Sequence, residues 1–218
     1  MQAFQETFNL SEPLQKAILD MGYSEPTPIQ SGSIPPMLEG RDIIAQAQTG
    51  TGKTAAFGIP LVDALDETDR HVQAIVLCPT RELCVQTAGE LRKLARYRRL
   101  STLAVYGGAP IERQLRSLRE GVQLVVGTPG RVMDHMRRGS LDLSRARIAV
   151  LDEADEMLDM GFRDDIETIL QATPDERQTA LFSATMPREI LMLGKRYLKS
   201  PVHIAISPKQ LTVDKIDQ

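Results

Sequence analysis

The residues with the clearest chemical capacity form the stretch AQTGTGKT, which begins at Ala47 and follows an apolar run. Its glycines can adopt backbone angles closed to other residues, so consecutive N–H groups can converge on phosphate oxygens. The positive end of a following helix would point at the same place. We predict a phosphate-binding loop rather than a simple Gly-rich turn. The residues predicted to hold a nucleotide here are Ala47, Gln48, Thr49, Gly50, Thr51, Gly52, Lys53 and Thr54.

Two side chains of this loop have specific expected roles. Lys53 would reach the β- and γ-phosphates, and Thr54 would bind Mg²⁺ through its hydroxyl. The general pattern begins with Gly, whereas this chain has Ala47 in that place. The predicted cofactors are therefore a nucleoside triphosphate and Mg²⁺.

Acidic side chains directly follow an apolar run in the stretch VLDEADEMLDMGF. In a phosphate-loop protein a second strand ends in an acid that holds Mg²⁺, and Asp152 has that place. Glu153 could orient or deprotonate the attacking water, and the ion would offset the desolvation of both carboxylates. We predict that Asp152 and Glu153 act with Lys53 in catalysis. The alternative, a helix N-terminus enriched in acids, suits Glu156 and Asp159.

A regular framework must position these groups. Amphipathic helical spacing alternates along the chain with short apolar runs. Near-continuous apolar strands joined by helices indicate an α/β fold, a three-layer sandwich with a mostly parallel sheet. The predicted strands are 42–47, 74–78, 102–106, 123–127, 148–152, 179–183 and 202–206, and the predicted helices include 82–97, 113–120, 131–139, 166–173 and 188–198.

Composition narrows the class of protein. With 218 residues, 42% hydrophobic and 25% charged, the chain is typical of one large soluble domain. The net charge of −3 argues against a general polyanion-coating surface, but a local basic patch could still bind nucleic acid. No signal pattern or membrane-length apolar run is present, and Cys78 and Cys84 read as reduced thiols. We expect a cytoplasmic protein.

The two ends of the sequence differ from its middle. The pattern of residues 1–40 predicts two short helices. Ser11 would cap the first helix, Gly22 would end it, and Thr27–Pro28 would begin the second. We expect them to form an extension laid against the first strand of the sheet. Residues 41–207 form the predicted core domain. The polar residues 208–218 read as the start of a linker to a domain absent from this chain.

Short elements along the chain resemble those of DEAD-box RNA helicases, in the same order. They are AQTGTGKT, PTREL (79–83), GG (107–108), TPGR (128–131), DEAD (152–155) and SAT (183–185). The stretch GYSEPTPIQ (22–30), with Phe8 upstream, resembles that family's adenine-sensing Q motif. Bacterial cold-shock members are the most similar, and Ala47 agrees with the family's variant of the loop. The resemblance implies the first RecA-like domain, with a P-loop NTPase fold, of an ATP-dependent RNA helicase.

The Q motif also has a physical interpretation. A Gln amide both donates and accepts, so Gln30 can pair with N6 and N7 of adenine, whereas guanine presents O6. Gln30 would therefore select ATP over GTP. Tyr23 could stack on the purine, or it could be a half-buried packing aromatic. The chain has no Asn-Lys-x-Asp element, which weakens a GTPase interpretation.

Three loops are the predicted RNA-binding elements. They lie at or just after strand ends, where open parallel sheets bind ligands. The resemblance implies that they hold the RNA sugar–phosphate backbone, with little sequence specificity. Taken alone, TPG would be only a capped helix start. The residues concerned are Pro79, Thr80, Arg81, Gly107, Gly108, Thr128, Pro129, Gly130 and Arg131.

The resemblance also assigns a coupling role to Ser183 and Thr185, which would contact Asp155 and link ATP hydrolysis to RNA unwinding. Hydroxyls beside a carboxylate can form such a hydrogen-bonded switch. The alternative is helix capping before Pro187. The basic run 92–99 could contact RNA, but a solvated helix end is the simpler interpretation. The three histidines have no metal-ligand spacing.

Two rival functions remain open at this point. One is an ATP-regulated clamp in which hydrolysis is incidental, and the other is a motor on DNA or protein. For the helicase, the resemblance implies RNA and a second RecA-like domain in cis as partners. That domain would supply the arginine that completes the ATP site. We expect residues 1–218 alone to be monomeric, to bind nucleotide and RNA weakly, and not to unwind duplexes.

Overall fold

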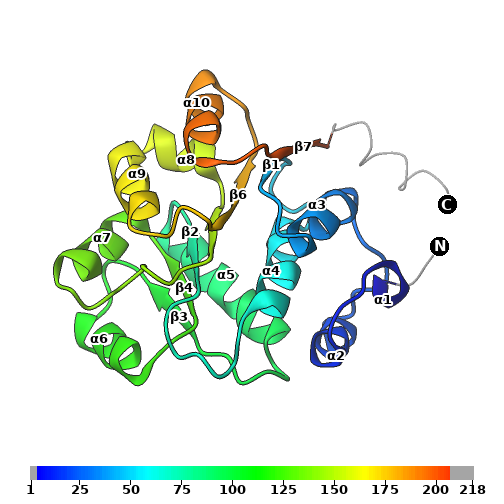
Figure 1. Ribbon diagram of the computed structural model, residues 1–218, viewed down its shortest axis with the longest axis horizontal. Helices are drawn as coiled ribbons and strands as arrows, with labels where there is room; N and C mark the ends of the chain where they lie inside the picture. Colours follow the sequence, from blue (N-terminus) through cyan, green and yellow to red (C-terminus); the bar gives the residue numbers. More distant parts are fainter. Residues whose placement is uncertain (1–3, 207–218) are drawn as a thin grey trace.

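Seven parallel strands form one sheet in the computed structural model, which describes residues 4–206 (Figure 1). Their order across the sheet is β3-β4-β2-β5-β6-β1-β7. All seven predicted strands are confirmed, and every pairing between them is parallel. The strands are β1 Ile43–Gln46, β2 Ala74–Leu77, β3 Thr102–Val105, β4 Leu124–Gly127, β5 Ile148–Leu151, β6 Gln178–Ser183 and β7 Val202–Ala205.

Helices cover both faces of this sheet (Figure 1). They are α1 Phe4–Thr7, α2 Glu12–Asp20, α3 Pro28–Leu38, α4 Lys53–Ala64, α5 Arg81–Leu94, α6 Ile111–Glu120, α7 Pro129–Arg137, α8 Ala154–Asp159, α9 Arg163–Gln171 and α10 Arg188–Tyr197. The predicted helices are present, with ends shifted by up to three residues. The short helix α1 had no counterpart in the sequence prediction, whereas α8 is the acid-rich helix start that was the alternative for Glu156 and Asp159. No helix in the range 4–206 has the length and apolar character to cross a membrane.

The strands divide the interior into two apolar layers. Successive side chains of a strand point to opposite faces. Ile43 and Ala45 of β1 therefore pack with α3, α4 and α5, whereas Ile44 packs with α7, α9 and α10. Strands buried on both faces need apolar residues at nearly every position. This arrangement confirms the predicted three-layer α/β sandwich.

The N-terminal helices lie against other helices more than against the sheet. α3 packs on α4 and touches β1 and β7, while α2 packs on α4 and α5. The expectation of an extension on the first strand is therefore correct only for α3. Gly22 ends α2 at φ 73°, as predicted. Ser11 precedes α2, but its hydroxyl bonds Asp63 near the end of α4 instead of capping its own helix.

The basic run 92–99 is not simply a solvated helix end. Arg98 donates to the backbone oxygens of Val62 and Leu65, at the C-terminal end of α4. It also pairs with Glu67 at 2.8 Å. Helix C-termini leave carbonyl groups without partners, and a guanidinium with five donors can satisfy several of them. Arg98 therefore ties the segment after α5 to α4, a pairing that its sequence neighbours do not reveal.

The functional loops leave one edge of the sheet. The phosphate loop follows β1, and the stretches PTREL, GG and TPGR follow β2, β3 and β4. The stretches DEAD and SAT follow β5 and β6. Because all strands are parallel, these ends meet along the same edge. The strand order places the three predicted RNA loops on one side of β5, with β6 and β1 on the other.

Candidate functional site

The loop between β1 and α4 has the backbone geometry of a phosphate cradle. Gly50 and Gly52 have φ values of 82° and 94°, a region that favours glycine. A Cβ at Gly52 would lie 2.6 Å from Nε2 of Gln30, so a larger residue would displace the Gln30 amide and would be strained at this φ. The Thr51 hydroxyl closes the turn by donating to the Gln48 carbonyl at 2.7 Å. α4 begins directly after the loop, so its first N–H groups are available to an anion.

Lys53 lies at the base of this loop with its charge incompletely matched. Its side chain is only 6% exposed, and Nζ has no hydrogen-bond acceptor among the described residues. The nearest anion is Glu153, with Oε1 at 3.8 Å from Nζ. A buried ammonium without close partners is costly. The oxygens of a nucleotide phosphate would satisfy it.

Asp152 is the second buried charge of the site. It follows β5, is 5% exposed, and its Oδ1 has no hydrogen-bond partner in the described range. Burial raises the pKa of Asp152 to about 6, although the nearby Lys53 acts to lower it. A desolvated carboxylate with an oxygen that has no hydrogen-bond partner fits a divalent cation. The donor set formed by Asp152 and the Thr54 hydroxyl, all oxygen, suits Mg²⁺.

Replacing Asp152 with Asn should stabilise the Mg²⁺-free protein by about 1–3 kcal/mol at pH 8. The folded-state pKa of about 6 exceeds the ordinary value of 3.8, so the native protein binds more protons than the unfolded chain between these values. The wild-type carboxylate therefore costs stability above pH 6, and this cost disappears as the pH falls towards 4. Urea unfolding with a chelator, from pH 8 down to pH 4, measures the difference.

The exposed acid Glu156 of α8 provides the matched control, since Glu156→Gln removes a charge from the same segment without changing a buried group. A stability difference between Asp152→Asn and wild type that does not change with pH would contradict the assignment of a raised pKa.

Glu153 is held in an uncommon backbone conformation. Its φ of 53° and ψ of 52° are left-handed, a region that costs a non-glycine residue about 1 kcal/mol or more. Its Oε1 accepts a hydrogen bond from the Thr49 hydroxyl at 3.1 Å. The loop after β1 and the turn after β5 thus jointly fix the carboxylate beside the phosphate cradle. A fixed carboxylate beside the phosphates is compatible with the predicted water-activating role, which stays a prediction.

These groups line one cavity of about 260 Å³. The predicted residues Tyr23, Thr49, Gly50, Gly52, Lys53, Thr54, Asp152 and Glu153 all line it. The predicted Ala47, Gln48, Thr51 and Gln30 do not, and Ala47 is a buried residue that extends the β1–β6 pairing by donating to Ser183. One wall comes from α5, which the sequence did not reveal as part of the site. Its lining residues are Leu83, Gln86, Thr87 and Glu90.

Gln30 is linked to the nucleotide loop through its own side chain. It accepts from the Thr27 backbone N–H at 2.8 Å, as in a capping box at the start of α3. Its Nε2 donates to the Gly52 carbonyl at 3.3 Å. A Gln amide has two lone pairs and two hydrogens, so one of each stays free for a base. The adenine-reading role stays a prediction, and the structure adds a positioning role for the loop.

Replacing Gln30 with Ala should weaken ATP binding more than GTP binding. The free-energy preference for ATP over GTP should fall by about 1–3 kcal/mol. The loss of the capping box should also lower stability by about 1 kcal/mol. The ratio of the two affinities is independent of the folded fraction, so a competition assay isolates base recognition. Ser31→Ala, at the exposed next position of α3, is the control. An unchanged ATP-to-GTP ratio in the Gln30 variant would remove this residue from base recognition.

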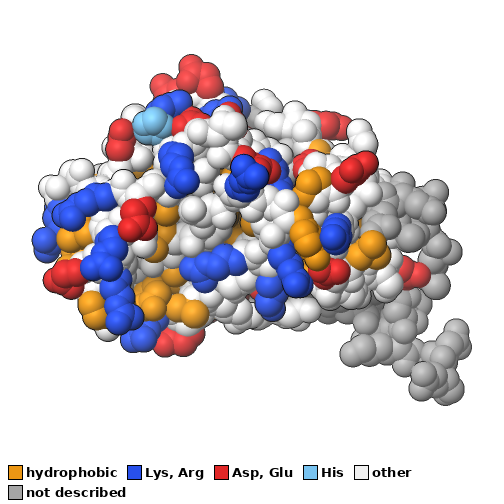
Figure 2. Space-filling view, turned by 90° about the horizontal axis from the view of Figure 1, so that it is seen from below, with side chains coloured by type: hydrophobic (Ala, Val, Ile, Leu, Met, Phe, Trp, Pro, Cys, Tyr) orange, Lys and Arg blue, Asp and Glu red, His pale blue; other side chains and the backbone are white. Residues whose placement is uncertain are grey.

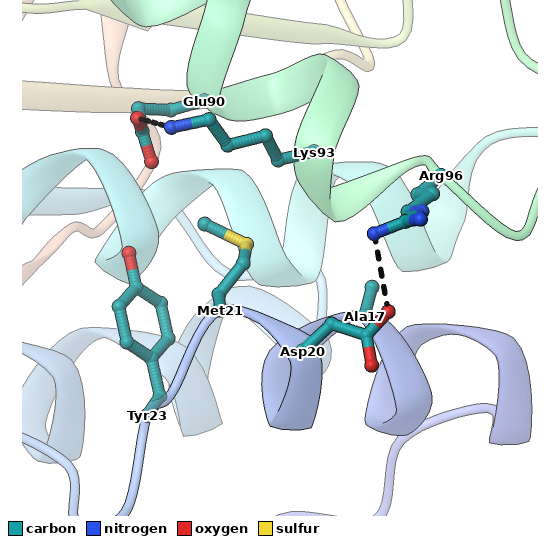
Figure 3. A pocket seen from close by; sticks show the side chains of 7 residues that line it. All are labelled: Ala17, Asp20, Met21, Tyr23, Glu90, Lys93 and Arg96. Atoms are coloured by element: carbon teal, nitrogen blue, oxygen red, sulfur yellow. Dashed lines mark hydrogen bonds and ion pairs between the residues drawn. The ribbon is translucent and has the colours of Figure 1, made fainter.

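Tyr23 lines both the nucleotide cavity and a second cavity of about 400 Å³, whose lining side chains Figure 3 shows. Burial and the Glu90 carboxylate raise the pKa of Tyr23, so its hydroxyl keeps its proton at neutral pH. Its ring also packs against Phe4, with centroids 6.1 Å apart. The packing and stacking interpretations of Tyr23 are therefore compatible. The second cavity is lined by Ala17, Asp20, Met21, Tyr23, Glu90, Lys93 and Arg96.

The charges around this second cavity neutralise each other in pairs. Lys93 contacts Glu90 at 2.6 Å, and Arg96 contacts Asp20 at 3.3 Å, as the dashed lines in Figure 3 mark. Paired charges of this kind contribute little to binding an external ion. The second cavity therefore lacks the unmatched charges that distinguish the phosphate cavity.

Two of the three predicted RNA loops, those after β3 and β4, are tied together by a residue that the sequence did not indicate. Gln114, 4% exposed on α6, donates from Nε2 to the Tyr106 carbonyl at 3.1 Å. Its Oε1 accepts from Arg131 at 3.3 Å and lies 2.9 Å from Nε2 of His135. Arg131 also donates to the Ala109 carbonyl at 3.3 Å. The loops after β3 and β4 therefore form one braced surface.

The predicted RNA residues differ in exposure. Arg81 of α5 is exposed, and its guanidinium lies 5.1 Å from the ring centroid of Tyr106. Thr80 caps α5 by accepting from the Leu83 N–H, whereas the Thr128 side chain makes no cap bond for α7. Pro79 and Pro129 are buried and shape the turns. The exposed members of the set are Arg81, Gly107, Gly108 and Gly130.

Asp155 and Thr185 make the contact that the resemblance implied. The backbone N–H and the hydroxyl of Thr185 donate to Oδ2 of Asp155 at 2.9 and 2.8 Å. Burial alone would raise the pKa of Asp155, but the hydrogen bonds of Thr185 and the nearby Ser183 hydroxyl outweigh it and lower the pKa. The Ser183 hydroxyl itself is buried and has no hydrogen-bond partner of normal geometry among the described residues. Pro187, not a hydroxyl residue, precedes α10, so the helix-capping interpretation is wrong.

Comparison with known proteins gives consistent results. The family model "DEAD/DEAH box helicase" matches residues 27–193. The chain is 53% identical over its whole length to the ATP-dependent RNA helicase CshA of Listeria monocytogenes, and 51% identical over 98% of its length to the DEAD-box ATP-dependent RNA helicase CshA of Bacillus subtilis. It spans 42% and 43% of these two relatives.

Solved structures show the same fold. A DEAD box protein from the hyperthermophile Methanococcus jannaschii superposes with a TM-score of 0.90 at 45% identity, covering 95% of this chain and 56% of that one. A hypothetical ATP-dependent RNA helicase from Sulfolobus tokodaii gives 0.84 at 39% identity, covering 90% and 57%. The RecA-like P-loop fold and the resemblance drawn from the sequence are confirmed. The chain belongs to the DEAD/DEAH box helicase family.

Proposed function

We propose that this chain is the ATP-binding, first RecA-like domain of an ATP-dependent RNA helicase that unwinds short RNA duplexes or remodels ribonucleoproteins. The observation that supports this most is a pair of buried charged atoms in one cavity, Lys53 Nζ and Asp152 Oδ1, which have no hydrogen-bond partners among the described residues. They are the complement of an anionic nucleotide and its cation. The names of the relatives from Listeria and Bacillus describe the same activity.

In this proposal each group of the cavity has one task in ATP hydrolysis. The loop backbone and Lys53 bind the phosphates, and Gln30 and Tyr23 hold the base. Asp152 and Thr54 would hold Mg²⁺, which supplies positive charge to the transferring phosphoryl group. Glu153, oriented by Thr49, accepts the proton of the attacking water.

The remaining predicted residues act on RNA. The loops after β2, β3 and β4 bind its sugar–phosphate backbone with little sequence preference, because backbone contacts carry no base information. The hydrogen bonds from Thr185 to Asp155 connect the segment that holds Glu153 to the loop after β6. A shift of the DEAD stretch on ATP hydrolysis would therefore also move the loop after β6 through this contact.

The domain arrangement belongs to the proposal too. Residues 1–40 form the Q-motif extension, 41–207 the RecA-like domain, and 208–218 the start of a linker. The linker lies outside the described residues. It would lead to a second RecA-like domain in cis, in a protein that works in the cytoplasm. Residues 1–218 alone would be monomeric.

A strand-separation assay tests the proposal against its rivals. The full-length protein with ATP and Mg²⁺ should separate a short RNA duplex, and Lys53→Ala should lose this activity together with tight ATP binding. ATP-dependent retention of RNA without strand separation would favour the clamp. Separation of DNA but not RNA would favour a DNA motor.

A further inference from the structure

A cavity of about 400 Å³ opens between α5, β3 and α6, beyond the nucleotide site. β3 is an edge strand of the sheet, so no further strand closes this side. Arginines and small residues shape much of its wall. The lining residues are Arg81, Arg92, Leu103, Ala104, Tyr106, Gly108, Ala109, Pro110, Arg113, Gln114 and Ser117.

The lining of this cavity is positively charged. It includes three arginines and no acidic residue. Arg92 is fixed over the edge strand, where Nε and Nη2 donate to the Thr102 carbonyl at 3.3 and 3.1 Å. Arg113, exposed on α6, has no ion pair or hydrogen bond with any described residue. Its charge is therefore free for an external anion. Figure 2 shows Lys and Arg side chains spread over much of the face that it displays, with acidic side chains among them.

The cavity is continuous with the loops proposed to bind RNA. Arg81 and Gly108 belong both to those loops and to the cavity wall. A Cβ at Gly108 would lie 3.4 Å from Nη1 of Arg81, so the two loops are in close contact. Gln114 braces the wall through the Tyr106 carbonyl. The wall is thus preorganised, which reduces the conformational entropy lost when a ligand binds.

We propose that this cavity is an additional RNA subsite, which takes the backbone phosphate of a nucleotide that leaves the loops after β2 and β3. Arg113 supplies the charge that contacts the phosphate, and the Arg81–Tyr106 pair forms the rim. This inference rests on the proposed RNA-binding function. A free guanidinium in a cavity continuous with backbone-binding loops favours RNA over an acidic protein segment.

The test uses the full-length protein with Mg²⁺ and a non-hydrolysable ATP analogue. The affinity for labelled oligouridylates is measured over a series of lengths and salt concentrations. Arg113→Gln should weaken binding of the longer RNAs about threefold or more and lower the salt slope by about 0.7, the value of one single-strand phosphate contact. The shortest RNA that binds should be unaffected.

Arg119→Gln is the matched control. It removes the same charge from the same helix, but it lies six residues away and therefore about 240° around the helix, outside the cavity lining. It should behave as wild type at every RNA length.

The outcomes are distinguishable. Absence of RNA binding by the wild type would overturn the proposed function itself. If the wild type binds RNA but the Arg113→Gln and Arg119→Gln variants bind it equally well at every length, only the subsite would be overturned. An equal loss on the shortest RNA would also overturn it, because Arg113 would then belong to the main binding track. Polyglutamate serves as a second probe. If Arg113→Gln left RNA binding unchanged but abolished polyglutamate binding, the cavity would be assigned to an acidic protein segment.

Discussion

Replacing Glu153 with Gln should leave ATP affinity close to the wild-type value and slow hydrolysis by about 10²–10⁴-fold. Gln retains the size of Glu and an oxygen that can accept the Thr49 hydroxyl bond. It cannot accept the proton of the attacking water. The variant should therefore accumulate in the ATP-bound state. Single-turnover hydrolysis by the full-length protein, beside equilibrium binding of ATP, measures both quantities.

Asp152→Asn is the informative comparison for this prediction. Asp152 is buried and proposed to hold Mg²⁺, so its replacement should weaken Mg²⁺-dependent ATP binding as well as hydrolysis. The two neighbouring acids should thus differ in which step they affect. Wild-type single-turnover rates in Glu153→Gln would move the water-activating role to another residue.

Residues 1–218 alone should hydrolyse ATP about 10³–10⁵-fold more slowly than the full-length protein, with little stimulation by RNA. The transition state of phosphoryl transfer needs positive charge beyond Mg²⁺, often from an arginine. Within the described range, Lys53 is the one cationic side chain that lines the phosphate cavity, and no arginine does. The resemblance places the missing arginine in a second RecA-like domain.

Both proteins are assayed for ATP turnover with and without RNA, and circular dichroism verifies that residues 1–218 are folded. A folded but slow protein is the expected result. Strong RNA-stimulated turnover by residues 1–218 would mean that a cis residue, or a second copy of the chain, completes the site.

Features governed by local sequence were predictable. The strands follow from short apolar runs, and the phosphate loop from glycines placed between a strand and a helix. The clustering of Lys53, Asp152 and Glu153 follows in turn, because parallel strands end at one edge. The turn that places Glu153 at positive φ could not be read from its residue type, since Glu rarely adopts that conformation.

Features that depend on long-range pairing were missed. Gln114 reads as an ordinary polar residue of an amphipathic helix, yet it is buried and connects two loops. Arg98 reads as part of a solvated basic run, yet it binds the end of α4. Gln30 was predicted to read a base, but its bond to the Gly52 carbonyl was not. In each case the partner is distant in sequence, and only the packing of helices on the sheet brings the groups together.

The most direct test of the central claim is the ATPase rate of the full-length protein with RNA, with DNA of the same sequence, or with neither. Coupling between the phosphate cavity and the loops after β2, β3 and β4 predicts slow turnover without nucleic acid and strong stimulation by RNA. DNA should stimulate little. Equal rates under all three conditions, or stimulation by DNA alone, would contradict the assignment of this chain to an RNA-dependent ATPase.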